Sequence, residues 1–128
     1  MLDRPDAAEL LEALAAFLSE DAAPALDGRR RFHALVAANV ARILAREART
    51  GQQRLATEVH ELWALLGRAG EPPAGADARE LVGEMCSELC ARIDAGDADD
   101  TPWGAQLVRY LKASIGRRLD IDAPEFRR

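Results

Sequence analysis

Aromatic residues are scarce in this sequence: Phe, Trp and Tyr together make up 5% of its 128 residues. A core must therefore be built mainly from Leu, Ala, Val and Ile. The scarcity also argues against a surface on which successive nucleotide bases stack, because such surfaces use aromatic side chains. The net charge of −5 and the pI of about 5.1 provide no basic footprint for nucleic acid. We therefore expect no nucleic-acid partner.

Long apolar runs and a cysteine framework are also missing. No stretch approaches the roughly 18 apolar residues that a membrane-spanning helix needs. The N-terminus MLDRPDAAEL is charged from residue 3 and does not look like a signal peptide. Two cysteines are too few for a disulfide framework. These absences predict a cytoplasmic protein without a membrane partner.

What the sequence does contain is apolar residues at helical spacing. We find no run that alternates apolar and β-branched residues with polar ones, so we expect no strand. The pattern predicts an all-α, single-domain bundle of about five helices, mostly antiparallel. Their expected ranges are 6–22, 29–50, 53–66, 78–95 and 102–119.

The boundaries of these helices rest on capping residues. Asp6 with Glu9 is typical of a capping box, Asp77 is a good N-cap, and Thr101 precedes Pro102 as an N-cap precedes the first helical residue. Gly51 is predicted to end the second helix as a C′ glycine.

The whole chain, 1–128, is expected to form one helical domain of a size that can bury a core. The segment GRAGEPPAGA, 67–76, is expected to be a flexible loop because it contains two prolines and three glycines. Residues 120–128 are expected to form a short C-terminal tail.

Motifs for catalysis and cofactor binding are missing as well. The sequence contains no phosphate-binding G-x-x-x-x-G-K-[ST] loop, no G-x-G-x-x-G and no G-x-S-x-G elbow. Cys86 and Cys90 lie four residues apart, but a zinc site needs two more ligands, and His33 and His60 have no helpful spacing. We therefore predict no catalytic residues, no cofactor and no metal, and nothing supports a self-contained enzyme.

The segment 28–44, GRRRFHALVAANVARIL, holds the candidate contact residues. A helical wheel places Asn39 near the centre of an apolar cluster formed by Phe32, Leu35, Val36 and Ile43. A buried amide without a partner costs roughly 1–3 kcal/mol. Asn39 is therefore either hydrogen-bonded inside the bundle or directed toward a groove or partner.

Arg29, Arg30 and Arg31 stand at the N-terminal end of this helix, where cations oppose the helix dipole. Helix stability does not explain them. Such a cluster suits contact with a carboxylate or phosphate, and a solvated or salt-bridged cluster is the alternative. His33, on the flank of the apolar cluster, is either packed and hydrogen-bonded or part of the same contact site.

Three segments resemble a family of small bacterial proteins with an otherwise uncharacterised domain. DRPDAAELL at 3–11 matches D-R-P-x-x-x-E-L-L, and a later L-C-x-x-I-x-x-G is matched at 89–96. The most specific hallmark, R-F-H-x-x-V-A-A-N, is matched by residues 31–39, in which Arg31, Phe32, His33, Val36 and Asn39 occupy the motif positions. The tail departs from the family's Asn-Pro-aromatic ending, because Ala123-Pro124-Glu125-Phe126 stands there.

The resemblance implies a companion of two larger enzymes. One is an aminoglycoside-phosphotransferase-like kinase, which would phosphorylate a hydroxyl group on a hydroxyacyl-CoA. The other is an acyl-CoA dehydrogenase, which would eliminate the phosphate. The first hypothesis is therefore a non-catalytic accessory subunit of such a kinase in hydroxy-acid catabolism. The second is a small-ligand module that binds an acyl-CoA or another anion, and the third is a structural homo-oligomer.

Overall fold

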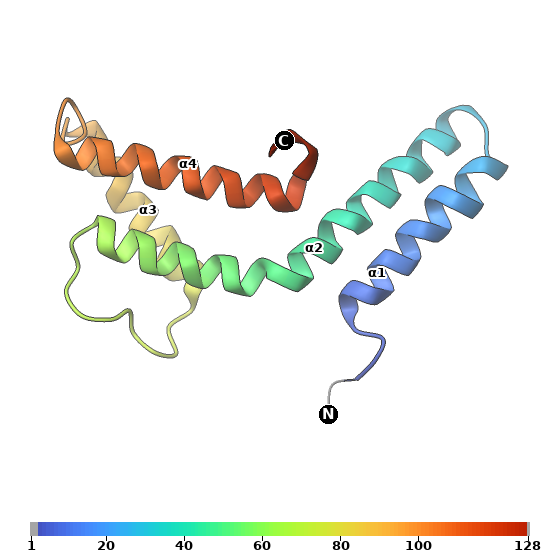
Figure 1. Ribbon diagram of the computed structural model, residues 1–128, viewed down its shortest axis with the longest axis horizontal. Coiled ribbons are helices and arrows are strands. Elements are labelled where there is room, and N and C mark those ends of the chain that lie inside the picture. Colours follow the sequence, from blue (N-terminus) through green and yellow to red (C-terminus); the bar gives the residue numbers. More distant parts are fainter. Residues whose placement is uncertain (1–2, 128) are drawn as a thin grey trace. The chain divides into compact units, whose positions relative to one another are not determined.

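The computed structural model describes residues 3–127, and within that range every regular element is a helix. The all-α class predicted from the sequence is confirmed. Figure 1 shows the course of the chain from α1 to α4. The helices are α1 (Ala7–Ala16), α2 (Gly28–Leu65), α3 (Ala78–Asp94) and α4 (Pro102–Asp122). The short elements are a π-helical turn η1 (Phe17–Ala22) and two 3-10 turns, η2 (Ala23–Ala25) and η3 (Pro124–Arg127).

The predicted helix starts agree with the capping contacts. Asp6 and Glu9 form a capping box, because each side chain accepts a hydrogen bond from the other's backbone N–H at 2.8 Å. Asp77 accepts hydrogen bonds from two backbone N–H groups at the start of α3. Thr101 caps α4 by accepting from the N–H of Gly104 at 3.0 Å. Local side-chain chemistry therefore sets where these helices begin.

The predicted end of a helix at Gly51 is wrong. The expected helices 29–50 and 53–66 are one continuous helix, α2, of 38 residues. A C′ glycine ends a helix by adopting positive φ, as Gly67 and Gly96 do, but Gly51 is not among the positive-φ residues. It lies buried within α2, and the Glu47 side chain packs across it. The interior glycine costs about 1 kcal/mol of helix stability.

The chain divides into two compact units, Met1–Gly51 and Gln52–Arg128, which we call unit 1 and unit 2. α2 supplies its first part to unit 1 and its last part to unit 2.

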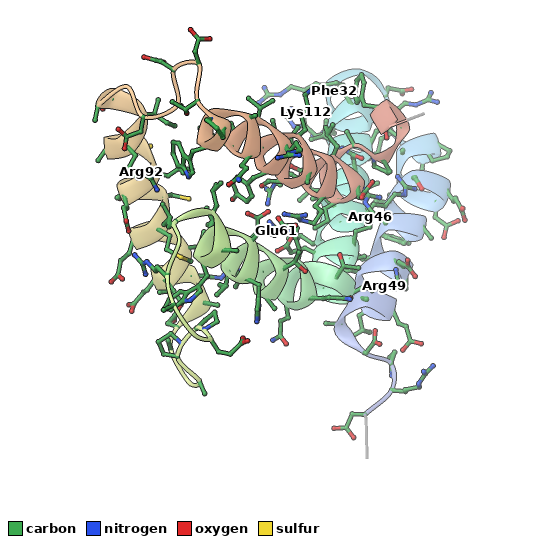
Figure 2. All side chains as sticks on the ribbon, turned by 60° about the vertical axis from the view of Figure 1, so that its left-hand side comes forward. Phe32, Arg46, Arg49, Glu61, Arg92 and Lys112 are labelled. Carbon is green, nitrogen blue, oxygen red and sulfur yellow. The ribbon has the colours of Figure 1, made fainter. Side chains whose placement is uncertain are left out.

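Unit 2 has a core of large apolar side chains where the last part of α2 meets α3 and α4 (Figure 1). Leu62 and Met85 are fully buried at its centre. Trp103 packs against this core, and its indole Nε1–H donates a hydrogen bond to the carbonyl of Leu65 at 2.8 Å. The Arg92 guanidinium, labelled in Figure 2, stacks on the Trp103 ring at 3.9 Å. The buried core residues are Val59, Leu62, Leu65, Met85, Leu89 and Leu107.

Unit 1 is a helical hairpin in which α1 lies beside the first part of α2 (Figure 1). The buried side chains of this hairpin are small. They are Ala8, Ala15, Ala23, Ala34, Ala38, Ala41 and Ala45. We call Ala34, Ala38, Ala41 and Ala45 the alanine seam of α2. Their spacing of three and four residues places them on one face of the helix.

The connecting segments agree in part with the loop and tail predicted from the sequence. The segment between α2 and α3 contains no helix, as expected for 67–76. α4 extends to Asp122, so the first residues expected in the tail belong to the helix. The last residue of that tail, Arg128, lies outside the described residues. Among the residues described, no helix combines the length and apolar character that crossing a membrane requires.

Candidate docking surfaces

The large apolar residues of α2 in unit 1 face away from the alanine seam. Val36 and Val40 each follow a seam alanine by two positions, which is about 200° around the helix. The predicted apolar cluster around Asn39 is therefore not a core face. Phe32 is 64% exposed, and Leu35, Val36, Val40 and Leu44 are each nearly half exposed, whereas Ile43 is partly buried. We call this set the α2 outer face: Phe32, Leu35, Val36, Val40 and Leu44.

Asn39 lies exposed on the α2 outer face, so its amide can bind water and needs no partner within the bundle. Of the two alternatives for Asn39, the one in which its amide is buried and hydrogen-bonded inside the bundle is wrong. His33 is also exposed; its Nε2 accepts a hydrogen bond from Arg29 Nε at 3.3 Å, and its ring meets Phe32 edge-on at 5.8 Å.

The three predicted arginines do not act as one cluster. Arg29, Arg30 and His33 line a shallow hollow of about 520 Å³ together with Leu26. Arg31 and Asn39 are not among its lining residues. All three arginine side chains are exposed. The structure thus brings three of the five sequence candidates together, but on an open surface.

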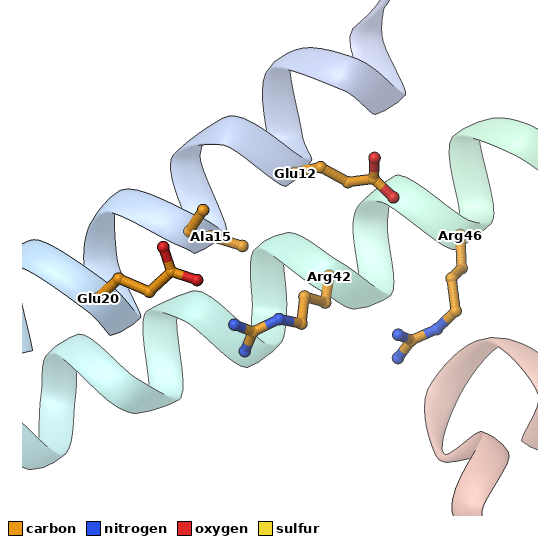
Figure 3. A pocket seen from close by; sticks show the side chains of 6 residues that line it. Glu12, Ala15, Glu20, Arg42 and Arg46 are labelled. Atoms are coloured by element: carbon orange, nitrogen blue, oxygen red, sulfur yellow. The ribbon is translucent and has the colours of Figure 1, made fainter.

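One side of the unit 1 hairpin is polar. Arg42 donates to Ser19 Oγ at 2.9 Å, and Arg49 pairs with Glu12. The hydrogen bond from Arg49 lowers the pKa of Glu12 below its ordinary value. Figure 3 shows Glu12 and Glu20 across from Arg42, around a hollow of about 340 Å³. Acidic and basic groups balance one another there, so the hollow has no net charge to select a ligand.

α1 and η1 also expose large residues. The helical spacing of Leu10, Leu14 and Phe17 alone would predict an inward stripe, but each is close to half exposed or more. Alanine occupies the contact with α2 instead, because two helices approach most closely where side chains are small. The prediction of their inward orientation is wrong.

Unit 2 holds a polar network around the buried Glu58 that sequence reasoning missed. Tyr110 donates its hydroxyl to Glu58 Oε2 at 2.5 Å, and Arg117 bridges Glu58 at 2.8 Å and Glu61 at 2.5 Å. Glu61 extends from α2 toward α4 in Figure 2. Tyr110 and Arg117 lie seven residues apart and so share one face of α4. From the sequence, this spacing could have predicted that Tyr110 and Arg117 share a face, but it could not identify Glu58 as their partner.

The network shifts the pKa values of its members. Burial alone would raise the pKa of Glu58, but hydrogen bonds from Tyr110, Arg117 and Ser114 outweigh it and lower that pKa. Burial, together with the hydrogen bond donated to Glu58, raises the pKa of Tyr110 far above its ordinary value of 10.0. Glu58 is therefore ionised and Tyr110 neutral at physiological pH. The network joins α2 to α4.

The outer side of α4 carries a second exposed apolar set. Leu107 is buried, but Val108, Leu111 and Ile115 are 49%, 40% and 58% exposed. We call Val108, Leu111 and Ile115 the α4 stripe. The helical spacing of these four apolar residues alone would predict an inward stripe, but for the three in the α4 stripe that orientation is wrong. The inner face is occupied instead by Leu107, Tyr110, Arg117 and Ile121.

The cysteines lie on α3. Cys86 is partly buried, which raises the pKa of its thiol, and Cys90 is exposed. Within residues 3–127, no group of three or more His, Cys, Asp or Glu side chains is arranged to hold a metal ion.

The described residues form an all-helical protein whose exposed apolar sets include the α2 outer face and the α4 stripe. The chain belongs to the family described as "Domain of unknown function (DUF6285)", whose model matches residues 24–126. That range includes both the α2 outer face and the α4 stripe. Neither the curated proteins nor the solved structures compared with this chain gave a match.

Proposed function

We propose that this chain is a non-catalytic accessory subunit that docks through the α4 stripe on a phosphotransferase-like kinase. One observation carries the proposal: the three exposed side chains of the stripe recur at i, i+3 and i+7 on a helix. This spacing is the one with which an amphipathic helix places anchors in an apolar groove of a protein partner.

The helix that bears the stripe is firmly held, which favours docking over general stickiness. On its inner face, α4 contributes Leu107 to the core and Tyr110 and Arg117 to the network with Glu58. Because α4 is already fixed in this way, the helix loses no further conformational entropy when its anchors bind a partner.

The charge of α4 favours a partner that is a different protein. α4 contains four basic residues, Arg109, Lys112, Arg117 and Arg118, and two acidic residues, Asp120 and Asp122, both in its last turn. Arg109 and Lys112 are exposed beside the stripe. Two copies packed through this stripe would bring like charges together, whereas a groove with an acidic rim would be complementary.

The nature of the partner follows from the family resemblance at residues 3–11, 31–39 and 89–96. It points to an aminoglycoside-phosphotransferase-like kinase that acts on a hydroxyacyl-CoA in hydroxy-acid catabolism, with an acyl-CoA dehydrogenase as a second companion. In this assignment the kinase supplies all the catalytic groups.

The test is binding and turnover of such a kinase from the same organism, with and without this chain. We expect a complex by isothermal titration calorimetry and a change in the rate of phosphoryl transfer to a hydroxyacyl-CoA. Ile115→Ala should weaken the complex by about tenfold, because Ile115 is the most exposed anchor of the stripe.

Gln106→Ala, an exposed change on α4 that leaves the stripe intact, serves as the matched control and should bind like the wild type. Absence of both binding and rate change with the wild-type chain would refute the proposal. Equal weakening by the two variants would refute the assignment to the stripe.

A further inference from the structure

The first part of α2 is apolar on two opposite sides. Its alanine seam is covered within unit 1, whereas the α2 outer face is exposed. A helix that is apolar around most of its circumference is normally buried on all those sides. The outer face therefore has the composition of a contact surface, and the question is which molecule covers it.

The charges on the outer face are arranged in a self-complementary way. Arg29 precedes Val36 by seven residues and Glu47 follows Val40 by seven, so both lie in line with the apolar residues. They are 18 residues apart, which is five full turns and about 27 Å. A basic group thus stands at one end of this line, and an acidic group, the partly buried Glu47 with Arg46 beside it in the sequence, stands at the other.

This arrangement selects one orientation for a second copy. If two α2 helices packed in parallel, the arginines at 29–31 of both copies would meet. If they pack antiparallel, Arg29 of each copy approaches Glu47 of the other. A two-fold symmetric contact needs a patch that complements itself in this manner.

Asn39 lies close to the midpoint between Arg29 and Glu47, which falls at residue 38. An antiparallel pair brings the two Asn39 side chains near the symmetry axis. Each amide has donors and an acceptor, so two can satisfy one another when buried. A single polar residue in an apolar helical seam fixes the register of the contact.

We propose that a second copy of this chain covers the α2 outer face, with the two α2 helices antiparallel about a two-fold axis near Asn39. The contact uses Phe32, Leu35, Val36, Val40 and Leu44 of both copies. It is separate from the α4 stripe, so one chain can self-associate and still dock a different partner.

Light scattering and sedimentation of the full chain over a range of concentrations test the proposal. We expect twice the chain mass of 13.9 kDa, falling to the single mass on dilution. The double variant Val36→Glu, Val40→Glu should raise the dissociation constant more than tenfold, because it buries unpaired carboxylates. Both positions are already exposed, so circular dichroism should show unchanged helix content.

Ala13→Glu, which adds a carboxylate at an exposed position of α1, is the matched control and should remain dimeric. A single mass at every concentration would overturn the proposal. So would an oligomer that the double variant leaves intact, since another surface would then hold it.

The orientation has its own test. Arg29→Glu alone and Glu47→Arg alone should each weaken the dimer, and the two changes combined should restore it. Rescue is expected only if these residues meet across the axis; loss without rescue would overturn the antiparallel arrangement. Ile115→Ala should remain dimeric, so a failure of kinase docking and a failure of self-association can be told apart.

Discussion

The two units bury very different side chains. Unit 2 encloses Leu62 and Met85 completely, whereas the buried apolar residues in the described part of unit 1, from residue 3 on, are all alanines. Leu44 and Phe32 of unit 1 remain outside. Because stabilisation by burial scales with the apolar area removed from water, an alanine seam contributes much less than a leucine core. Unit 2 therefore buries the large side chains of a self-sufficient core, whereas unit 1 would gain the most stability if its outer face were covered.

The polar contacts of the two units differ in the same way. The Glu12–Arg49 pair of unit 1 is about half exposed on both sides, so solvent and salt screen it. Glu58 of unit 2 is 5% exposed and held by Tyr110 and Arg117. A surface pair can be lost at little cost, whereas a buried carboxylate needs its partners.

Replacing a leucine by alanine should distinguish the two units most clearly, because only in unit 2 does it leave a cavity. Leu62→Ala in unit 2 should cost about 2–5 kcal/mol of unfolding free energy, because Leu62 is fully buried. Leu44→Ala, the same change at a 48% exposed site of unit 1, should cost less than about 1 kcal/mol in dilute solution. Urea titration followed by circular dichroism measures both. If the outer face is covered by a second copy, the Leu44→Ala effect should grow with protein concentration and that of Leu62→Ala should not.

Close backbone contact is a further feature of unit 2. A Cβ on Gly104 would lie 2.0 Å from the carbonyl oxygen of Ala98, so Gly104→Ala should cost about 1–3 kcal/mol or more. Gly83→Ala on α3 meets nothing within 4 Å and should gain about 0.5–1 kcal/mol as a better helix former. Thermal denaturation should show opposite shifts, and equal shifts would mean that α4 does not approach Ala98 so closely.

The close packing at the alanine seam can be tested by replacing one of its alanines with a larger residue. Ala38 is completely buried, so Ala38→Leu should force the helices of unit 1 apart at a cost of about 1–3 kcal/mol. Ala37→Leu, one residue away and exposed, should change stability by less than about 0.5 kcal/mol. Urea titration is again the measurement, and a harmless Ala38→Leu would contradict the seam.

The polar network predicts a pH dependence that belongs to unit 2. The pKa of Glu58 is lowered from 4.5, so the unfolded state binds the proton first and stability falls as the pH drops below 4.5. The pKa of Tyr110 is raised above 10.0, so the unfolded state loses its proton first and stability falls as the pH rises above 10.0.

Tyr110→Phe should abolish the alkaline loss and cost about 0.5–1.5 kcal/mol at neutral pH through the missing hydrogen bond. Glu12→Gln, at the exposed pair of unit 1, should have almost no effect. Stability curves from pH 3 to pH 11 (roughly, the range in which carboxyl and phenol groups titrate) compare the three proteins. An alkaline loss that persists in Tyr110→Phe would show that another group causes it.

Sequence reasoning succeeded where the cause is local. Asp6, Asp77 and Thr101 were identified as caps because an N-cap acts on the backbone two or three residues ahead. It failed at Gly51, because glycine is compatible with both a helix end and a helix interior. It also failed to find Glu58, whose partners Tyr110 and Arg117 lie more than 50 residues away in the sequence.

By itself, the sequence determined the helical class, most helix starts and the apolar character of the surfaces around Val36 and Val108. Those properties follow from spacing and short-range hydrogen bonds. Only the tertiary structure decided which apolar side of each helix is covered. That choice depends on how closely neighbouring helices approach: alanines took the inner positions in the first part of α2, and Leu107 and Ile121 with the polar Tyr110 and Arg117 took those of α4. Phe32, Val36, Val108 and Ile115, with Asn39 beside the first two, were left exposed.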